Sequence, residues 1–545
     1  MKRFVGLTLV ALLACGAVAQ GDPVRTITVL SQPQAAAPYE YQSIQLVANA
    51  WRQLGVDVEI QVAPWEQLSD IVWFNRETWD ATGWQMVGRP ERSDPDEIVF
   101  NLFHSSTAER GFNFVGYNNP EYDAVAEAQR VATDPEERRK LIYEAQAIID
   151  RDQPYAFLVY PESIYAYRTD VWNPDSIVEQ SGIGIKNTWT FIGAEPIGSQ
   201  RDMVLNSNFV VQAINPLYIS GSVDSWITEL VWDRLLRVGP DGLPVPWSAE
   251  SYEWIDDVTI DVVLREGMTW HDGAPVTVED VVFSFEAAGG GEAPMYTPFV
   301  SAIAGIEVRD ERTVRFTLTR PQAAFLTASL AKVNLIPKHV WEPILADLAG
   351  KDENAESYQE ATPIGSGPFT FVRWRASEEV VLAANPNHWS APKMDRWILR
   401  MIPNVEATLG ALRSGELNFL AAYPGDPAVL TATASGNPIE VVASTDIGFR
   451  FVAFNHRRPP FDDAAFRRAL SQAINRDLII DAAYNDFATA ANSPVSIALE
   501  FWNNPDVADF ATGLDLARQT LADAGYVLVD GRLHYPTGVS ETLGR

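Results

Sequence analysis

The sequence contains one cysteine, Cys15, among its 545 residues. It lies in a secretory signal pattern, in which Lys2 and Arg3 precede a short apolar run and then small residues. The stretch Ala17-Val18-Ala19 is an ordinary cleavage site, whereas Leu12 to Cys15 resembles a lipoprotein box that would leave a lipid anchor on Cys15. We favour a signal peptide over 1–19 and an extracytoplasmic location. In both cases the mature fold has neither a disulfide nor thiolate chemistry.

The sequence also lacks the common catalytic motifs: G-x-S-x-G, H-E-x-x-H, G-x-G-x-x-G and the Walker loop. Its six histidines, at 104, 271, 339, 388, 456 and 534, are scattered without the spacing of zinc ligands. Neighbouring carboxylates such as Asp256-Asp257 and Asp462-Asp463 are adjacent in sequence and therefore poorly placed to share a bond that is cleaved. We predict no enzyme activity, no catalytic residues, no metal and no cofactor.

Basic residues are scarce: 41 Lys and Arg stand against 72 Asp and Glu, for a formal charge of −31. This balance opposes binding to nucleic acid or to anionic lipid, because phosphates are neutralised by Lys and Arg. Hydrophobic residues make up 47% and aromatic residues 11%, as in a globular protein. The length predicts two to four domains. We expect a monomer with no transmembrane helix in the mature chain.

Local patterns alternate between strand and helix and predict an α/β fold. Thr259 to Leu264 has the β-branched, apolar composition of a strand, and His271-Asp272-Gly273 supplies a turn. Thr277 is placed as the N-cap of a following helix, with Asp280 completing a capping box. Near the N-terminus, Tyr41 to Leu54 predicts an amphipathic helix, Gly55 its end and Val56 to Val62 a strand.

The segment from Leu264 to Phe285 reads LREGMTWHDGAPVTVEDVVFSF. It resembles the segment "LRxGvxFHDGxPvTAeDVvfSf" of the extracytoplasmic solute-binding proteins that serve peptide-type ABC importers, the oligopeptide- and dipeptide-binding family 5. Other stretches resemble further family motifs: Asp80 to Trp84, Gly116 to Asp123, Trp232 to Leu236, Gly365 to Phe369, Asn385 to Trp389, Leu412 to Asn418 and Leu521 to Tyr526.

The order of these motifs differs from the order in the family. Motifs of the family's last third occupy residues 26–189, whereas those of its first two thirds begin near Asn215, after a linker-like stretch from Gly193 to Gln200. We interpret this order as a circular permutation, which a fold tolerates when its termini lie close together. The alternatives are a fusion of two broken genes and a mis-assembled sequence.

The resemblance implies a two-lobed periplasmic-binding-protein-like fold of type II, in its large three-domain variety, with a ligand cleft between the lobes. The hinges would lie near Phe449 to Asn455 and near Ser181 to Trp189. Carried onto this chain, the implied parts are these: signal peptide 1–19; C-terminal part of lobe two 24–181; hinge return and linker 182–199; lobe one 200–236 and 362–450; extra domain 237–361; N-terminal part of lobe two 451–545.

The resemblance also implies ligand-binding residues. In the dipeptide-binding branch, the Trp of a GWxxD motif packs on the ligand and its Asp pairs with the ligand's ammonium group. Here Trp84 matches the Trp, but Val87 stands in place of the Asp. Further candidates in the following loop are Asp94, Glu91 and Arg89, and those in the strand FRFVAFN are Phe449 and Phe451. Two isolated tryptophans, Trp226 and Trp270, are also candidates. A solvated loop and a packed core are the alternative interpretations of these residues.

The function that the resemblance implies is capture of oligopeptides, or of similar elongated solutes, for delivery to the permease subunits of an ABC importer. Because the anchoring Asp is missing and the chain has 17 Trp, an oligosaccharide ligand is the close alternative. An extracytoplasmic hydrolase is the remote one.

Overall fold

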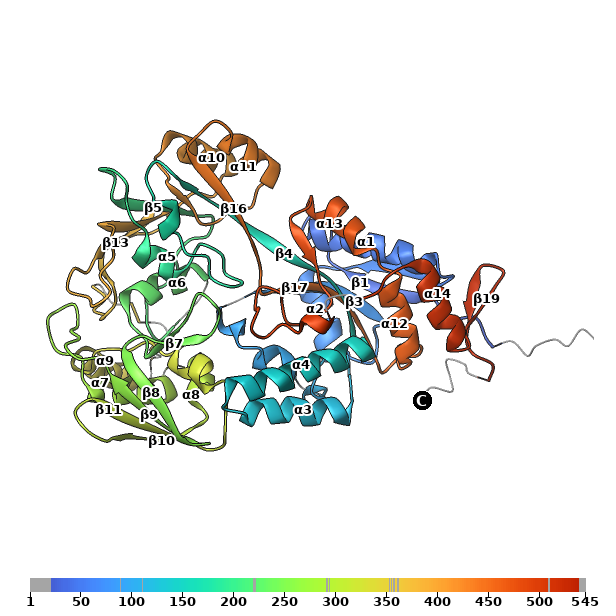
Figure 1. The fold of residues 1–545 in the computed structure, drawn as a ribbon, viewed down its shortest axis with the longest axis horizontal. Coiled ribbons are helices and arrows are strands. Elements are labelled where there is room, and N and C mark those ends of the chain that lie inside the picture. Colours follow the sequence, from blue (N-terminus) through green and yellow to red (C-terminus); the bar gives the residue numbers. More distant parts are fainter. Residues whose placement is uncertain are drawn as a thin grey trace, which may run out of the picture.

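The structure is a computed structural model that describes residues 21–538, except for 89, 110, 219–221, 291, 292, 294, 352, 354, 356, 357, 360, 361, 508 and 509. The predicted signal peptide, with Cys15, and Arg89 lie outside the described residues. The chain forms three groups of elements around a long central strand (Figure 1).

A 12-stranded sheet runs through the molecule in the order β12-β13-β14-β5-β15-β4-β17-β3-β1-β2, with β16 and β18 also paired to β4. The strand β4 (Tyr155–Arg168) is long enough to belong to both parts of this sheet. Its first residues pair with β17 (Phe449–Phe454) and β18 (Ala488–Ala490). From Glu162 onward it pairs with β16 (Ile439–Thr445). The sheet therefore changes partners near Glu162, and this divides the molecule into two halves.

The first half joins the beginning and the end of the chain. Its remaining strands are β1 (Ile27–Ser31), β2 (Val58–Val62), β3 (Ala81–Met86) and the hairpin β19 (Val527–Val529) with β20 (Arg532–His534). Its helices are α1 (Pro38–Arg52), α2 (Trp65–Phe74), α3 (Pro120–Val131), α4 (Pro135–Asp152), α12 (Ala464–Gln472), α13 (Arg476–Tyr484) and α14 (Leu514–Asp523). Both of its hydrophobic cores mix residues from the two ends of the chain. The two segments therefore form one packed unit.

The two ends of the described chain also touch directly. Pro23 forms an antiparallel bridge with His534. The N–H of Val24 donates to the carbonyl of Leu533 at 2.8 Å, and the N–H of Tyr535 donates to the carbonyl of Asp22 at 2.9 Å. The hairpin β19–β20 thus holds the residues that precede β1.

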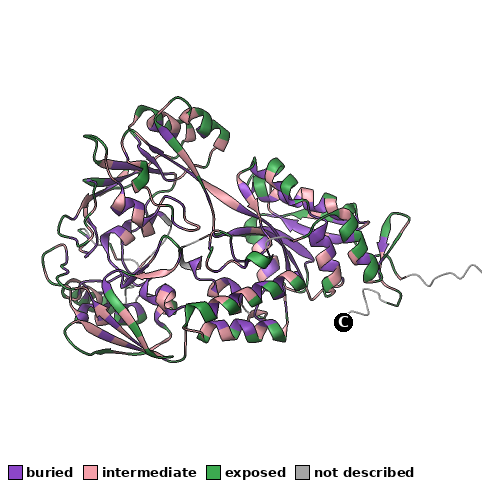
Figure 2. Cartoon of the chain, in the orientation of Figure 1, coloured by how far each residue is buried: buried purple, intermediate pink, exposed green. Residues whose placement is uncertain are grey.

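The second half carries the other part of the sheet. Its strands, besides β16, are β5 (Asp202–Ser207), β12 (Phe369–Arg375), β13 (Glu379–Ala384), β14 (Arg396–Met401) and β15 (Phe419–Leu420). Its helices are α5 (Thr188–Gly193), α6 (Ser222–Val231), α10 (Val405–Ser414) and α11 (Pro427–Ala434). Buried side chains follow the strands of both halves, while helices turn one face to solvent, as Figure 2 shows.

A third group of elements packs beside the second half and shares its largest hydrophobic core. Its strands are β6 (Leu236–Val238), β7 (Pro244–Pro246), β8 (Ala249–Asp256), β9 (Thr259–Leu264), β10 (Ile303–Val308) and β11 (Thr313–Leu318). Its helices are α7 (Val278–Gly289), α8 (Thr297–Val300) and α9 (Lys338–Lys351). Here the predicted strand Thr259 to Leu264 is confirmed, and Thr277 with Asp280 forms the predicted capping box of α7.

The chain crosses between the halves at two adjacent places. One is the middle of β4, and the other is the short segment from Asp446 to Gly448 that joins β16 to β17. The second crossing lies close to β3, since a Cβ added at Gly448 would stand 2.2 Å from the carbonyl oxygen of Met86. The predicted second hinge, Ser181 to Trp189, follows the β4 crossing and contributes Ile185 to the core of the second half.

Candidate functional site

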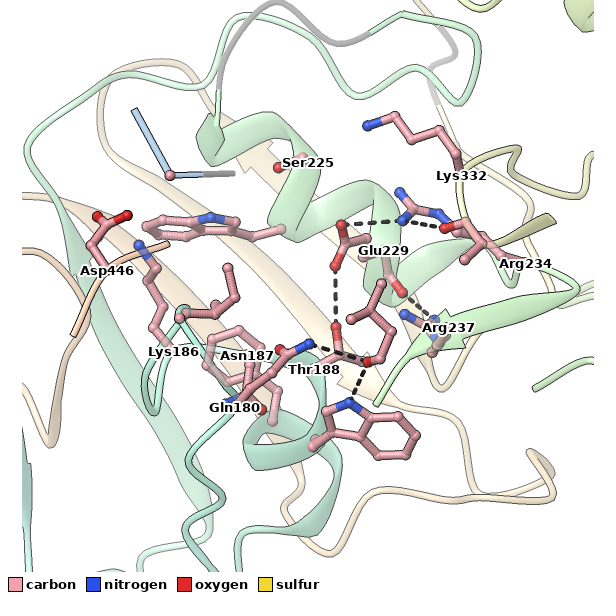
Figure 3. A pocket seen from close by; sticks show the side chains of 18 of the residues that line it. Gln180, Lys186, Asn187, Thr188, Ser225, Glu229, Arg234, Arg237, Lys332 and Asp446 are labelled. Atoms are coloured by element: carbon pink, nitrogen blue, oxygen red, sulfur yellow. Dashed lines mark hydrogen bonds and ion pairs between the residues drawn. The ribbon is translucent and has the colours of Figure 1, made fainter. Parts of the chain in front are cut away.

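A cavity of about 730 Å³ lies between the two halves and the third group of elements. Its walls come from five separate stretches of the chain, and Figure 3 shows many of their side chains converging. Most lining residues belong to the segment after β4, to α6 and β6, and to the region around α8. Val87, Gly88 and Glu97 come from the first half, and Asp446 from a crossing segment. The cavity therefore sits where a movement of the halves would change its shape.

The floor of the cavity is the segment that leads from Gln180 into α5. Asn187 caps this helix by accepting from the N–H of Thr190 at 2.9 Å, while its Nδ2 donates to the carbonyls of Val178 and Gly184. The indole Nε1 of Trp189 donates to the carbonyl of Val238 in β6 at 2.9 Å. Hydrogen bonds to backbone carbonyls thus hold the floor against the neighbouring wall, so that it forms a fixed surface.

At one end of the cavity Lys186 lies between an aromatic face and a carboxylate. Its Nζ stands 4.4 Å from the ring centroid of Trp226, within the range of a cation–π contact. Figure 3 shows its amine pointing towards the side chain of Asp446. Burial lowers the pKa of Lys186 to about 8, against the attraction of Asp446. Burial likewise raises the pKa of Asp446. In both groups burial therefore favours the neutral form.

At the other end, α6 and β6 bring a carboxylate next to two guanidinium groups. Glu229 accepts from Thr188 Oγ1 at 3.2 Å and lies 3.3 Å from Nη1 of Arg234. The Nη2 of Arg237 donates to the backbone carbonyl of Glu229 at 2.6 Å, and its guanidinium lies 4.6 Å from the ring centroid of Trp247. Burial lowers the pKa of Arg237 to about 10, so it is still charged at neutral pH.

Two predicted binding residues line the cavity. Val87, with 45% of its surface exposed, borders it just after the end of β3, and Trp226 borders it from α6. The prediction for Val87 rests on the resemblance, and the prediction for Trp226 rests on its aromatic side chain alone. Their binding role stays a prediction, which the cavity makes testable.

The other aromatic candidates pack in the core of the first half. Trp84, Phe449 and Phe451 are exposed by 5%, 0% and 1%, and none of them borders the cavity. Phe451 lies opposite Trp84 across β17 and β3, stacks on Tyr155 at 4.7 Å between centroids and is enclosed by rings. The packed-core alternative thus describes Phe449 and Phe451 in this structure, and Trp84 is packed in the same core, because helices and loops cover the face of the sheet on which they lie.

Asp94 and Trp270 also have structural partners away from the cavity. The carboxylate of Asp94 accepts two hydrogen bonds from the buried guanidinium of Arg138, at 2.6 and 2.7 Å. Trp270 is 2% exposed and its Nε1 faces Asp280 at 3.3 Å. The side chains of Arg89 and Glu91 are not among those described. The loop after Val87 is therefore held, at Asp94, by an internal ion pair.

Sequence reasoning did not identify the charged residues of the cavity: Glu97, Lys186, Glu229, Arg234, Arg237, Lys332 and Asp446. One signal was available for two of them. Arg234 and Arg237 flank two leucines in the stretch WDRLLRV, and arginine within an apolar run is seldom buried unless it is paired. For the others the sequence offers no motif, because each joins the cavity only through tertiary packing.

The lining combines aromatic faces with charged groups of both signs, which suits a solute that has both polar and apolar parts. Among residues 21–538 as described, no group of three or more His, Cys, Asp and Glu side chains is arranged to hold a metal ion. Within the same residues, no helix combines the length and apolar character that crossing a bilayer requires.

Comparison with known proteins identifies a family. Residues 244–543, more than half of the chain, match the model for bacterial extracellular solute-binding proteins, family 5 Middle. A protein of Brucella ovis, named as a candidate ABC transporter peptide-binding protein, is 33% identical over 286 residues, covering 52% of each chain. The oligopeptide-binding protein AppA of Bacillus subtilis is 27% identical over 345 residues, covering 61% of this chain and 60% of that one. The chain spans about half the length of the first curated relatives it matches.

Among solved structures, AppA of Bacillus subtilis in complex with a nonapeptide aligns with a TM-score of 0.44 at 24% identity, over 61% of this chain and 66% of that one. A periplasmic oligopeptide-binding protein of Thermotoga maritima aligns with a TM-score of 0.49 at 25% identity, over 62% and 66%.

Proposed function

Because the chain belongs to the bacterial extracellular solute-binding proteins of family 5, we propose that it is the substrate-binding component of an ABC importer. It captures oligopeptides, or similar elongated solutes, outside the membrane and delivers them to the permease. The observation that carries this proposal is the cavity of about 730 Å³ at the two crossings between the halves. That volume falls in the range of about 300–1,000 Å³ that is typical of ligand sites.

Binding in this proposal works by closure. A ligand that contacts Val87 of the first half and Trp226 of the second half stabilises the arrangement in which both halves approach it. The crossings in β4 and at Asp446 to Gly448 are the places where the chain would bend. The free energy of binding thus favours the closed form, which the permease would recognise.

An oligosaccharide is the second candidate ligand. The cavity wall includes aromatic rings, among them Trp226, Tyr296 and Phe299. Such faces stack on sugars as well as on apolar side chains. A hydrolase is the remote alternative, which turnover of a bound ligand would reveal.

Thermal unfolding with candidate ligands tests the proposal. A ligand that binds only the folded state adds about 2.7 kcal/mol of stability at a hundredfold excess over its Kd. We expect a raised melting temperature with members of a peptide library and none with cello- or xylo-oligosaccharides. Shifts with sugars alone would replace the peptide by an oligosaccharide, and release of cleaved products would point to the hydrolase.

We also propose that the chain is circularly permuted relative to its family. It is supported by the shared cores of residues 24–159 and 452–535 and by the bridge between Pro23 and His534. In the family's order the chain would run from the hairpin into β1. A variant that links residue 538 to residue 21 and opens the chain at Gly198, where an added Cβ meets nothing within 4 Å, should fold with the same circular dichroism spectrum. Separate melting of the two segments in the native chain would contradict the permutation.

The predicted domain boundaries, the monomeric state and the cleavage after Ala19 complete the proposal. Size-exclusion chromatography with light scattering measures the oligomeric state. Mass spectrometry of the mature N-terminus distinguishes the two cleavage sites, because a diacylglyceryl mass on Cys15 would establish the lipid anchor.

A further inference from the structure

The third group of elements contacts the first half as well as the second. In the loop after β11, the N–H of Ala323 donates to the carbonyl of Arg130 at 2.7 Å. Arg130 lies in the last turn of α3, where a backbone carbonyl has no acceptor role within the helix. Figure 1 shows α3 and α4 beside the third group. A residue of the third group therefore caps a helix of the first half.

The second contact is made by the turn that joins β6 to β7. The carbonyl of Pro240 in this turn accepts from the N–H of Ser181 at 2.7 Å, which fixes the turn in position. The half-buried side chain of Leu243 packs against a core of the first half. A Cβ added at Gly242 would stand 3.4 Å from Cδ2 of Leu499, a residue of that core. The turn therefore buries apolar surface between the third group and the first half.

The contact at Arg130 is connected to the wall of the cavity. Glu97 lines the cavity, and the carboxylate of the neighbouring Asp96 lies 3.1 Å from Nε of Arg130. The guanidinium of Arg130 also lies 4.0 Å from the ring centroid of Phe100. One short segment thus borders the cavity and holds the end of α3. A solute that orders this segment also orders the carbonyl to which Ala323 donates.

Both contacts depend on how the halves are arranged. The third group shares the largest core of the second half, so it moves with that half. When the first half moves away from the second, the contacts of Ala323 and Leu243 are lost. Neither residue is among the described residues that line the cavity. The two contacts therefore favour the arrangement in which the halves enclose the cavity, whichever solute is bound.

We propose that the third group of elements acts as a latch, in which Ala323 and Leu243 hold the first half against the second and so set how long a solute stays bound. The inference rests on the proposed function. The two residues act through the fraction of molecules in which the halves enclose the cavity. The apparent Kd is the intrinsic Kd divided by that fraction, so losing either contact weakens the binding of different solutes by the same factor.

Ala323→Pro tests the backbone contact. The N–H of Phe325 donates to the carbonyl of Gln322 at 3.1 Å, so Ala323 is the second residue of a β-turn, a position that favours proline. The variant therefore loses the donor and keeps the turn. The probes are the two library peptides, or the two oligosaccharides, that raise the melting temperature most. We expect both to dissociate about 5-fold faster in stopped-flow fluorescence. Ala323→Ser keeps the N–H and is the matched control.

Leu243→Ala tests the side-chain contact. The variant loses apolar surface that is buried against the first half, and we expect both probes to dissociate about 10-fold faster. Leu345→Ala is the matched control, because this half-buried leucine of α9 packs on the core that the third group shares with the second half. It should leave the dissociation rates unchanged. Circular dichroism should give the same spectrum for all four variants.

The outcomes separate the latch from the proposed function. Unchanged dissociation in both Ala323→Pro and Leu243→Ala would overturn the latch and leave solute capture standing. Equal acceleration in the controls would overturn it too, because general loosening of the third group would then explain the effect. If neither a peptide nor a sugar binds, the proposed function fails and small-angle X-ray scattering decides the latch. A larger radius of gyration in both variants would then support it, and an unchanged one would overturn it.

Discussion

Two aromatic groups on either side of the crossings have opposite environments. Around Trp84 and Phe451, each ring meets other rings, as in the 5.9 Å contact between these two. Around Trp226, the ring meets the ammonium group of Lys186 and borders a cavity. Aromatic side chains serve cores and binding sites equally well. Trp226 differs from the rings of the first group because it has a charged neighbour and borders a cavity.

Phe451→Ala should disrupt the packing of the rings around Trp84 and cause the largest loss of stability. Removing a fully buried ring leaves a cavity, and we expect a loss of about 3–5 kcal/mol in the free energy of unfolding, measured by urea denaturation. Trp84→Ala should behave in the same way. A small loss of stability combined with a large loss of ligand affinity would instead make either residue a ligand contact.

Trp226→Ala should weaken ligand binding. We expect the affinity for the bound solute to fall about 10-fold, which corresponds to about 1.4 kcal/mol, because the variant loses an aromatic face in the cavity. Titration calorimetry measures it. Trp254→Ala, at another half-buried tryptophan in β8 that does not line the cavity, is the control and should leave the affinity unchanged.

Val87→Asp tests whether the first half also contacts the ligand. The side chain is 45% exposed, so the change in the free energy of unfolding should stay within about 0.5 kcal/mol. The new carboxylate borders the cavity and should favour peptides with a free amino group over N-acetylated ones by a few-fold. An unchanged ratio of the two affinities would show that Val87 does not face the ligand's amino group.

Lys186→Met should change the pH dependence of stability. The folded-state pKa of about 8 lies below the ordinary value of 10.5, so between these pH values the unfolded chain binds more protons at this residue. Its contribution to stability is complete above pH 10.5 and is lost as the pH falls through about 8. Denaturation at pH 7.5, 9 and 10 should show a shallower rise in stability for the variant. Equal slopes would contradict the lowered pKa.

Local elements were predictable because short-range rules decide them. The helix α7 begins at the predicted capping box, in which the side chain of Thr277 accepts from the N–H of Asp280. The strand β9 has its predicted bounds. Each of these depends on residues within a few positions of one another. Their agreement with the structure needs no knowledge of the tertiary fold.

The candidate site was predictable only at two positions. Val87 and Trp226 border the cavity, whereas Trp84, Phe449 and Phe451 lie in a core that the same alternation of apolar residues would equally produce. Whether a ring faces a ligand depends on what packs against its strand from elsewhere. Asp94 illustrates the point, since its partner Arg138 comes from a helix 44 residues further along.

By itself the sequence determined the α/β class and the family, because composition and contiguous motifs carry this information. Only the tertiary structure decided where a cavity forms between the two halves. The cavity gathers side chains from Val87 to Asp446, and the charge of each wall depends on how these distant residues pair, as Glu229 does with Arg234. Pairing of this kind is a property of packing in three dimensions and leaves no local pattern in the chain.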